Sequence, residues 1–405
     1  MNRKTLIVLG VATALAVGAA LFVDHSRTPQ SNVAEKAGML APGLRDHVNE
    51  VTKITFTSAG NQPAVTLVRG ERGWTVSQRG GYPADLGKLR EYLLRFADAI
   101  LLEQKTANKD RYPDLGVEDI TAADAKGVLV DLDGLPAPLR VIVGTFDGQG
   151  GNGTFVRRAD EAQSWLAKGT LTPDKDPAAW LAKDLPGIAA ERVARVEIRH
   201  ADGRSVRVER KAPGDTQLVI ADIPKGRQPS SGYVANGLGS VLAELRLDDV
   251  APAAEVPPPQ SAVQARYTTF DGIVVDVQAW KVGERAHATF AARLDAEAAA
   301  RHIDQAQEDA ATEHAAALAS TAKPADAETG ASADAGTPEA PLAVRDPAAD
   351  RSGRLAALEA EVEELNRAFA GWSIVLPAYK YANIDKSLDD LLAPVEAKST
   401  SRPKP

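Results

Sequence analysis

Apolar and polar residues alternate over several short stretches once the chain passes residue 50. Alternation with a period of two residues is typical of a strand that buries one of its faces. A helix is expected over 86–100, because apolar residues recur there at helical spacing after Asp85, a residue type that caps helices. The strands predicted on either side of this helix are 54–56, 65–69, 74–76, 128–132, 139–143 and 154–157.

The same order of patterns returns about 140 residues later, which indicates an internal repeat. The first three strands correspond to 196–198, 206–210 and 218–220. The later strands 139–143 and 154–157 correspond to 273–277 and to Thr289-Phe290. A second helix is predicted between these groups from an apolar stripe formed by Val234, Leu238, Val241, Leu242 and Leu245. The fold class expected is therefore α+β, with two tandem modules of mainly antiparallel sheet and a packed helix.

The N-terminal pattern is different, since residues 5–23 form a run without any charge. As a helix this run would be about 28 Å long, close to the thickness of a bilayer core. Arg3 and Lys4 precede it, so the positive-inside rule keeps the N-terminus in the cytoplasm. We therefore expect a single-pass protein of the inner membrane with the bulk of the chain in the periplasm. The alternative is a cleaved signal peptide, with small-residue sites at 14–16 and 18–20.

The last third of the chain interrupts the second module. An Ala-rich helix is expected over 296–318, and a segment over 320–350 with few large apolar residues predicts a disordered linker. Order is expected to resume at Ser352 with a helix. Its stripe has coiled-coil spacing, which fits a helix docked on its own domain or a helix that binds a partner. The stripe consists of Leu355, Leu358, Val362, Leu365 and Phe369.

These patterns give the expected domain organisation. The membrane anchor is 1–23, a tether follows over 24–50, and the first module is 51–170. A linker over 171–192 leads to the second module, 193–295, with the insertion over 296–370. The module closes with a strand and a short helix over 371–393, and 394–405 is a tail.

Composition narrows the function classes. The chain of 405 residues has 47 basic and 55 acidic side chains, a net charge of −8, so a nucleic-acid partner is not expected. It contains no cysteine, which excludes disulfides, thiolate nucleophiles and cysteine-ligated metal centres.

The candidate chemical motifs are weak. The glycines of 148–153 match a dinucleotide-binding spacing, but a strand follows where a helix is needed, so they predict a hairpin loop. Asp131, Asp133 and Gly134 match only part of a calcium loop and predict a strand end and turn. Asp248 and Asp249 are interpreted as solvated charge. The six histidines show no metal-ligand spacing.

No catalytic, cofactor-binding or metal-binding residue is therefore assigned, and no cofactor is expected. The segment 111–117 is interpreted as a structural turn, with Tyr112 and Leu115 packed under the sheet. Trp180 is interpreted as a packing anchor between the modules rather than a ligand-stacking residue.

A family resemblance rests on short segments along the exported region. They are the N-terminal anchor, 73–76, 111–117, Val143-Gly144 with 154–157, Trp180-Leu181 and 371–377. Together they resemble a bacterial envelope family classed only as a domain of unknown function. The resemblance implies a link to auxiliary components of gliding-motility-type ABC transporters, beside which members are often encoded. It transfers no catalytic residue.

The expected function is a membrane-anchored accessory or scaffold protein of an envelope transport system, with protein partners and without enzymatic activity. A periplasmic solute-binding module is one alternative, and it requires an apolar pocket between the modules lined by aromatics such as Trp180. A carboxylate-dependent hydrolase is the other, and it requires acids from different strands that converge in a cleft.

Overall fold

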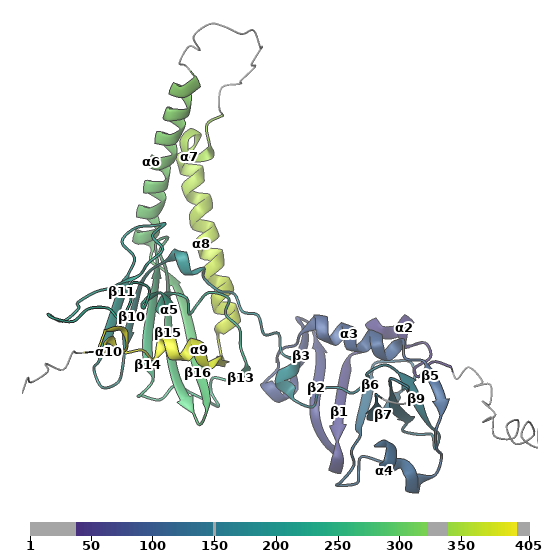
Figure 1. The fold of residues 1–405 in the computed structure, drawn as a ribbon. Coiled ribbons are helices and arrows are strands. Elements are labelled where there is room, and N and C mark those ends of the chain that lie inside the picture. Colours follow the sequence, from purple (N-terminus) through teal and green to yellow (C-terminus); the bar gives the residue numbers. More distant parts are fainter. Residues whose placement is uncertain (1–37, 149–150, 322–338, 395–405) are drawn as a thin grey trace, which may run out of the picture. The chain divides into compact units, whose positions relative to one another are not determined.

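The computed structural model describes residues 38–148, 151–321 and 339–394 (Figure 1). The chain divides into two compact units. The first consists of the residues up to Gln78 together with Pro83–Trp180, and the second consists of Arg79–Tyr82 together with the residues from Leu181 onward. The main division, between Trp180 and Leu181, falls inside the interval 171–192 that the sequence suggested as a linker.

The first unit is built on one nine-stranded sheet of antiparallel pairs. The order across the sheet is β4-β3-β2-β1-β6-β7-β8-β9-β5. The strands are β1 (Lys53–Ser58), β2 (Gln62–Gly70), β3 (Gly73–Val76), β4 (Tyr82–Pro83), β5 (Leu101–Gln104), β6 (Val128–Asp133), β7 (Leu139–Asp147), β8 (Gly153–Arg158) and β9 (Ser164–Lys168). The α-helices are α2 (Leu44–His47), α3 (Leu86–Ala97) and α4 (Tyr112–Leu115).

Helix α3 covers one face of this sheet. The Asp85 side chain accepts a hydrogen bond from the backbone N–H of Lys88 at 3.0 Å, so the predicted N-cap is confirmed. The buried side of the helix presents Tyr92, which packs edge-on against Phe56 of β1 with ring centroids 5.3 Å apart. Trp180 lies 5.1 Å from the same phenylalanine ring and is 1% exposed. This aromatic group fixes the helix on the sheet.

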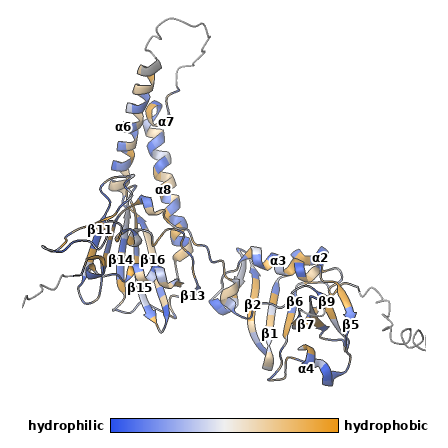
Figure 2. Cartoon of the chain, in the orientation of Figure 1, coloured by the Kyte–Doolittle hydropathy of each residue, from blue (hydrophilic) through white to orange (hydrophobic). Residues whose placement is uncertain are grey.

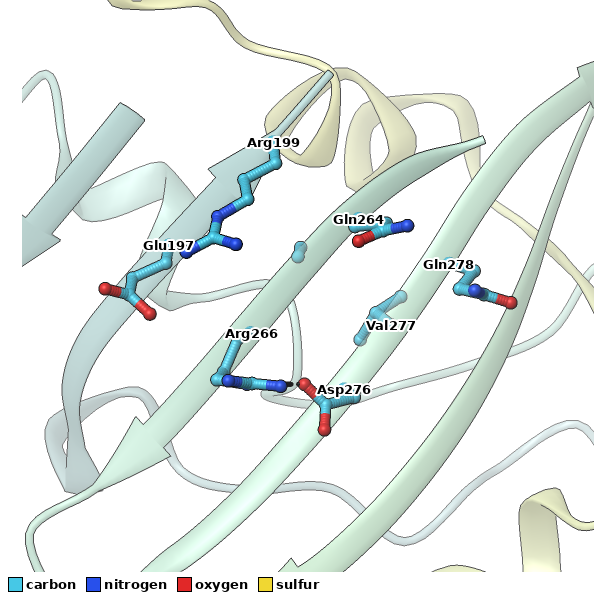
Figure 3. A pocket seen from close by; sticks show the side chains of 8 residues that line it. Glu197, Arg199, Gln264, Arg266, Asp276, Val277 and Gln278 are labelled. Atoms are coloured by element: carbon cyan, nitrogen blue, oxygen red, sulfur yellow. Dashed lines mark hydrogen bonds and ion pairs between the residues drawn. The ribbon is translucent and has the colours of Figure 1, made fainter. Parts of the chain in front are cut away.

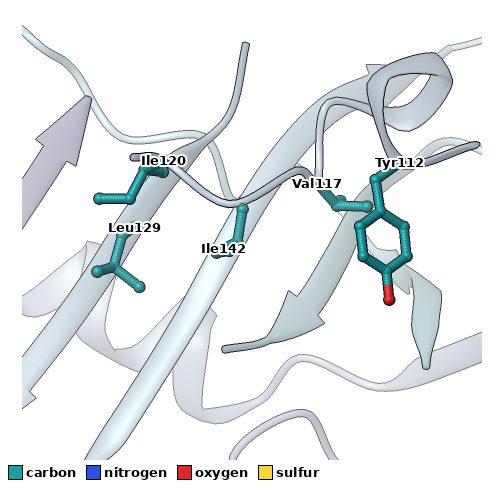
Figure 4. Close-up of a cluster of buried hydrophobic side chains, with 5 residues drawn as sticks. All are labelled: Tyr112, Val117, Ile120, Leu129 and Ile142. Atoms are coloured by element: carbon teal, nitrogen blue, oxygen red, sulfur yellow. The ribbon is translucent and has the colours of Figure 1, made fainter. Parts of the chain in front are cut away.

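A second cluster covers the opposite face of the first sheet (Figure 4). Leu129 and Ile142 belong to it and pair across β6 and β7. Because side chains alternate along a strand, these two point away from the face that holds Phe56 and α3. Tyr112, at 3% exposure, packs on this cluster together with the half-buried Leu115. The prediction that segment 111–117 is a structural turn under the sheet is confirmed.

The second unit has an eight-stranded sheet in the order β12-β11-β10-β14-β15-β16-β17-β13. Its strands are β10 (Val193–Arg199), β11 (Ser205–Glu209), β12 (Val219–Ile220), β13 (Asp249–Pro252), β14 (Val263–Thr269), β15 (Ile273–Val282), β16 (Arg285–Leu294) and β17 (Trp372–Leu376).

Single 3-10 turns also occur along the chain, namely η1 (Val48–Glu50), η2 (Ala59–Asn61), η3 (Ser77–Arg79), η4 (Lys109–Arg111), η5 (Pro177–Trp180) and η6 (Ala190–Arg192).

The strand orders of the two sheets match. Reading from β3 in the first unit, the order β3-β2-β1-β6-β7-β8-β9-β5 corresponds strand for strand to β12-β11-β10-β14-β15-β16-β17-β13. Every strand correspondence predicted from the sequence repeat fits this alignment, for example β1 with β10 and β7 with β15. The protein therefore has an α+β fold made of two antiparallel sheets with helices, and the internal repeat is a repeat of topology.

The predicted helix of the second unit is largely wrong. Only α5 (Asn236–Gly239) is helical, and turns occupy the rest of the segment. The apolar stripe is nevertheless buried, since Leu238, Val241, Leu242 and Leu245 are at most 3% exposed. Glycines at 232, 237 and 239 disfavour a continuous helix, because glycine has a low helix propensity.

The insertion between β16 and β17 forms a helical hairpin. Helices α6 (Ala296–Thr321) and α8 (Pro347–Phe369) run side by side away from the sheet, with α7 (Leu342–Arg345) between them in sequence (Figure 1). The expectation of disorder over 320–350 is wrong for 320–321, which belong to α6, and for 342–350. Asp346 caps α8 and Pro347 occupies its first turn, so this helix starts before Ser352. Residues 322–338 lie outside the described residues.

Two short helices close the second unit, α9 (Ala378–Ile384) and α10 (Leu388–Leu391). Both fall within 371–393, where the sequence predicted a closing strand and one short helix. Among the helices described, none is long and apolar enough to cross a membrane. The expected membrane span over 5–23 lies outside the described residues.

Candidate functional site

A groove with a volume of about 570 Å³ lies beside helix α3 in the first unit, which we name the Trp74 groove. Volumes of this size are typical of ligand sites. Three parts of the unit form it, namely η1, the ends of β2 and β3, and the first three turns of α3. Its lining consists of Val48, Asn49, Arg69, Gly73, Trp74, Leu86, Leu89, Arg90, Leu93 and Leu94.

The local sequence explains why the groove is apolar. Leu86, Leu89 and Leu93 belong to the stripe of α3 that predicts the helix, and at spacing i, i+3 and i+7 they share one face. Leu89 and Leu93 are buried against the sheet, whereas Leu86 is 56% exposed at the start of the helix. Trp74 continues this apolar surface from β3 and is half-buried. The N-terminal end of the stripe, at Leu86, therefore extends past the core of the unit.

The charged residues of the groove are all basic. Arg69 and Arg90 are exposed, and none of the ten lining residues is acidic. Arg69 donates one hydrogen bond to the backbone carbonyl of Asn49, which leaves most of its N–H donors unused. Within the described chain no hydrogen bond or ion pair involves the Arg90 side chain. By contrast, Lys88 on the same helix is occupied by Asp174 and by the carbonyl of Ala179.

Trp180 has a different role from the one expected. The sequence suggests that Trp180 packs between the modules, but it lies in the core of the first unit, where its indole N–H donates to the Asp174 carbonyl at 3.1 Å. Trp180 is 1% exposed, so it does not offer the ring surface to a ligand that the solute-binding alternative required. Trp74 lines a groove and is only half-buried.

A second hollow, of about 230 Å³, lies on the sheet of the second unit (Figure 3). The side chains that point into it come from β10, β14 and β15. Glu197 and Asp276 supply two negative charges, and Arg199 and Arg266 supply two positive ones. Arg266 donates to Asp276 at 2.6 Å, and this hydrogen bond raises the pKa of the arginine. The charges balance one another, so this hollow selects ligands by charge less than the Trp74 groove does.

A histidine, a serine and an aspartate lie in neighbouring strands of the second sheet. His287 Nδ1 is 3.0 Å from the Ser373 hydroxyl, and its ring stacks on Trp280 with centroids 5.8 Å apart. Val375 lies between His287 and Asp249 in the strand register. Ser373 has no exposed surface and His287 is 5% exposed, so a substrate could not reach the hydroxyl. These residues connect the strands.

The interpretation of Asp249 as solvated charge is wrong. Its residue is 6% exposed, and one carboxylate oxygen lies 3.1 Å from Arg285 Nη1. The other accepts the backbone N–H of Val250 at 2.9 Å. Asp249 begins β13, which pairs with β17, and this position buries its side chain. Pairing with a strand distant in sequence could not be seen in the local pattern.

The other sequence motifs take structural positions. The glycine-rich segment lies between β7 and β8, so a strand follows it as expected, although residues 149 and 150 lie outside the described residues. Asp131 and Asp133 end β6 and face Arg140 and Lys53. Burial raises the pKa of Asp131, and Arg140 partly opposes this. Across the described residues, no group of three potential metal ligands occurs.

The helical hairpin of the second unit carries most of the net charge of the chain. Residues 296–321 and 339–369 contain twelve Asp or Glu, five Arg and no Lys. This gives a net charge of −7, against −8 for the whole chain. Polar contacts between α6 and α8 include an ion pair between Arg351 and Asp304, and hydrogen bonds from Gln307 to the Asp350 carboxylate and to the Pro347 carbonyl. Figure 2 shows hydrophilic positions along both helices.

Neither the Trp74 groove nor the acidic helical hairpin was recognised from the sequence as a functional site. The stripe of α3 and Trp74 were both noted, but only the structure shows that they lie next to each other and next to Arg69. The excess of Glu on α8 was visible in the sequence. Whether these residues form an exposed charged surface depended on whether another element covers the helix.

Comparison with known proteins gives one match. A search of curated proteins and a search of solved structures each found none. A family model described as a domain of unknown function (DUF4340) matches residues 74–263, from β3 of the first unit to the first residue of β14 in the second. Over this interval the chain is similar to a family classed as a domain of unknown function, as the resemblance implied.

Proposed function

We propose that the protein is a membrane-anchored extracytoplasmic scaffold, held by residues 5–23, that binds protein partners in an ABC-type envelope transport system. The uncharged N-terminal run supports the anchor, and the family resemblance supports the transport system. The observation that carries the scaffold function is the acidic helical hairpin of the second unit.

The internal repeat supplies a reference for this hairpin. In the first unit β8 and β9 are joined by residues 159–163, whereas the equivalent strands β16 and β17 are joined by residues 295–371. The fold therefore closes with a short connection and does not need the insertion. The insertion contributes to the core mainly through the first turns of α6, with Ala299 and Ile303, and the end of α8, with Leu365 and Phe369, which are all at most 2% exposed. The remainder is available for another role.

The exposed surface of the hairpin fits a basic partner. Glu359, Glu363 and Glu364 are exposed on α8, and no hydrogen bond or ion pair within the described chain occupies them. Unpaired charges of one sign on a surface favour association with a partner of opposite sign and fix its orientation. The stripe residues Leu355 and Leu358 are half-buried beside them, so they can add apolar contact.

The test is crosslinking and co-purification of the full chain from native membranes. We expect a defined set of partners with the wild type, and its loss when Glu359, Glu363 and Glu364 are changed to Gln. The matched control changes Glu71 and Glu284 to Gln and Asp124 to Asn, three exposed acids outside the hairpin, for the same change in net charge. Equal recovery of partners with both triple variants would contradict the proposed role of the hairpin.

The two alternatives have less support. A hydrolase needs carboxylates free to exchange protons with a substrate, and in the hollow of Figure 3 Asp276 already binds Arg266. The tryptophan that the solute-binding alternative required is buried in the core of the first unit.

A further inference from the structure

The Trp74 groove is a second surface of the protein and is independent of the hairpin, since it lies wholly in the first unit. Its lining combines leucines and a tryptophan with two arginines. Trp and Arg are enriched in protein interfaces because both give large contact areas together with a polar group. The groove is therefore suited to a ligand that is apolar on one side and negatively charged.

The dimensions indicate which apolar ligand fits. Leu86, Leu93 and Leu94 line the groove from the first turn of α3 to its third. At 1.5 Å per residue, this apolar lining extends over about 12 Å. An amphipathic helix that binds in a groove uses apolar anchors at i, i+3 or i+4, and i+7, which extend over about 10 Å. The lining is thus as long as the apolar stripe of two helical turns.

The charges determine the polar side of the ligand. Arg90 follows Leu86 by four residues, so both lie on the same side of α3. Arg69 is the cross-strand partner of Trp74, which places the second guanidinium on the β-sheet side. The apolar lining thus has one arginine on α3 and the other on β2. An arginine binds a carboxylate through two parallel hydrogen bonds, and both arginines have N–H donors available.

We propose that the Trp74 groove binds an amphipathic helix of a partner protein, with its apolar stripe against Trp74 and Leu86 and its acidic residues paired with Arg69 and Arg90. The site lies outside the proposed role of the hairpin and does not depend on it. Leu86 and Trp74 provide the apolar contact, and the two arginines select against basic helices.

The experiment selects ligands without assuming a sequence. A displayed library of helix-forming peptides is enriched on the purified full chain in detergent. We expect enriched peptides to carry Leu or Ile at i, i+3 or i+4 and i+7, with Asp or Glu beside them. Binding of an enriched peptide, measured by fluorescence anisotropy, should weaken about tenfold in Arg90→Gln. It should also weaken in Leu86→Ser.

Matched controls separate the groove from general effects. Arg95→Gln changes an exposed arginine on the same helix that does not line the groove, and Leu102→Ser changes an exposed leucine on β5. Both should bind the peptide as the wild type does. A thermal unfolding curve for each variant verifies that it is folded, and the exposure of Leu86 and Arg90 predicts little change.

Three results would overturn the proposal. The first is enrichment of peptides without acidic residues, or of none at all. The second is equal weakening in Arg95→Gln and Arg90→Gln, which would show a general charge effect. The third is tight binding of dodecanoate at Leu86 and Arg90 together with no peptide binding, which would assign the groove to a small anionic amphiphile. Because all variants keep the hairpin intact, these results leave the test of the scaffold function unaffected.

Discussion

Two buried tyrosines differ in whether their hydroxyl groups have a partner. Tyr92 donates to the Leu171 carbonyl at 3.3 Å, whereas the hydroxyl of Tyr267 is buried and has no partner among the described residues. Burial raises the pKa of both phenols, so both stay neutral. A buried hydroxyl without a hydrogen bond has a desolvation cost that its removal abolishes.

We therefore expect Tyr267→Phe to leave the free energy of unfolding unchanged or to raise it by about 1 kcal/mol. Tyr92→Phe is the matched control and should lower it by about 1 kcal/mol, because a hydrogen bond is lost. Chemical denaturation of the full chain measures both. A larger loss in Tyr267→Phe than in Tyr92→Phe would show that the hydroxyl has a role that the structure does not reveal.

His287 should make stability depend on pH. Burial lowers its pKa from the ordinary value of 6.5, the nearby Arg285 lowers it further, and Asp249 partly opposes this. The unfolded chain therefore binds this proton more readily than the folded one. The stability that neutral His287 contributes is fully present above pH 6.5. It is lost as the pH falls from 6.5 toward the lower pKa of the folded state.

We expect the loss of stability between about pH 7.5 and about pH 5.5 to be smaller in His287→Gln than in the wild type. Glutamine can still hydrogen-bond to Ser373 but does not titrate. Denaturant unfolding at the two pH values gives the difference directly. Equal losses in the two proteins would contradict a lowered pKa at this position.

At the scale of elements, helix α8 is expected to divide into two parts. Phe369 stacks on Phe290 of β16 with centroids 4.8 Å apart and is 2% exposed, whereas Leu355 is only half-buried. Phe369→Ala should therefore cost about 3–5 kcal/mol of stability, as large-to-small core changes do. Leu355→Ala should cost about 1 kcal/mol, because less apolar area is lost. Thermal unfolding distinguishes them, and equal costs would mean that the far end of the hairpin is also core.

Local patterns predicted elements well where one residue period decided the structure. The strands around 54–56 and 65–69 alternate clearly, and α3 has both a stripe and a cap, so each was found. The second unit's helix shows the limit of this reasoning. Its stripe has helical spacing, but Gly232, Gly237 and Gly239 disfavour a helix, and only Asn236–Gly239 is helical. The prediction followed the apolar period and gave too little weight to these glycines.

The site was less predictable than the fold, for the same reason. Trp74 and Leu86 were both recognised as apolar, and burial was the natural expectation for each. Only the pairing of β3 with β2 shows that Trp74 lies beside Arg69. Only the exposure of Leu86 shows that the start of α3 extends past the core. The error for Asp249 was the opposite one. Its side chain was expected in solvent but is buried, because β13 pairs with β17.

At the scale of the whole molecule, the repeat explains why the sequence was informative. Two units with one strand order present the same succession of periods twice, so each copy supports the interpretation of the other. The copies then differ where their surroundings differ. The first has a full helix beside its groove, and the second has a short α5 and the long hairpin. Differences between equivalent positions of a repeat are thus where separate functions are best sought.

The proposed anchor gives the last prediction. An uncharged run of about 28 Å as a helix should hold the chain in the bilayer after high-salt and alkaline washing, since both remove proteins bound only by charge. Deletion of residues 2–23 should release it, whereas Arg69→Gln with Arg90→Gln, a surface change of the first unit, should not. Protease added to the periplasmic side should cut from Lys36 onward and spare the N-terminus. N-terminal sequencing decides between the two interpretations, because a mature chain that begins near Val17 or Leu21 would show a cleaved signal peptide.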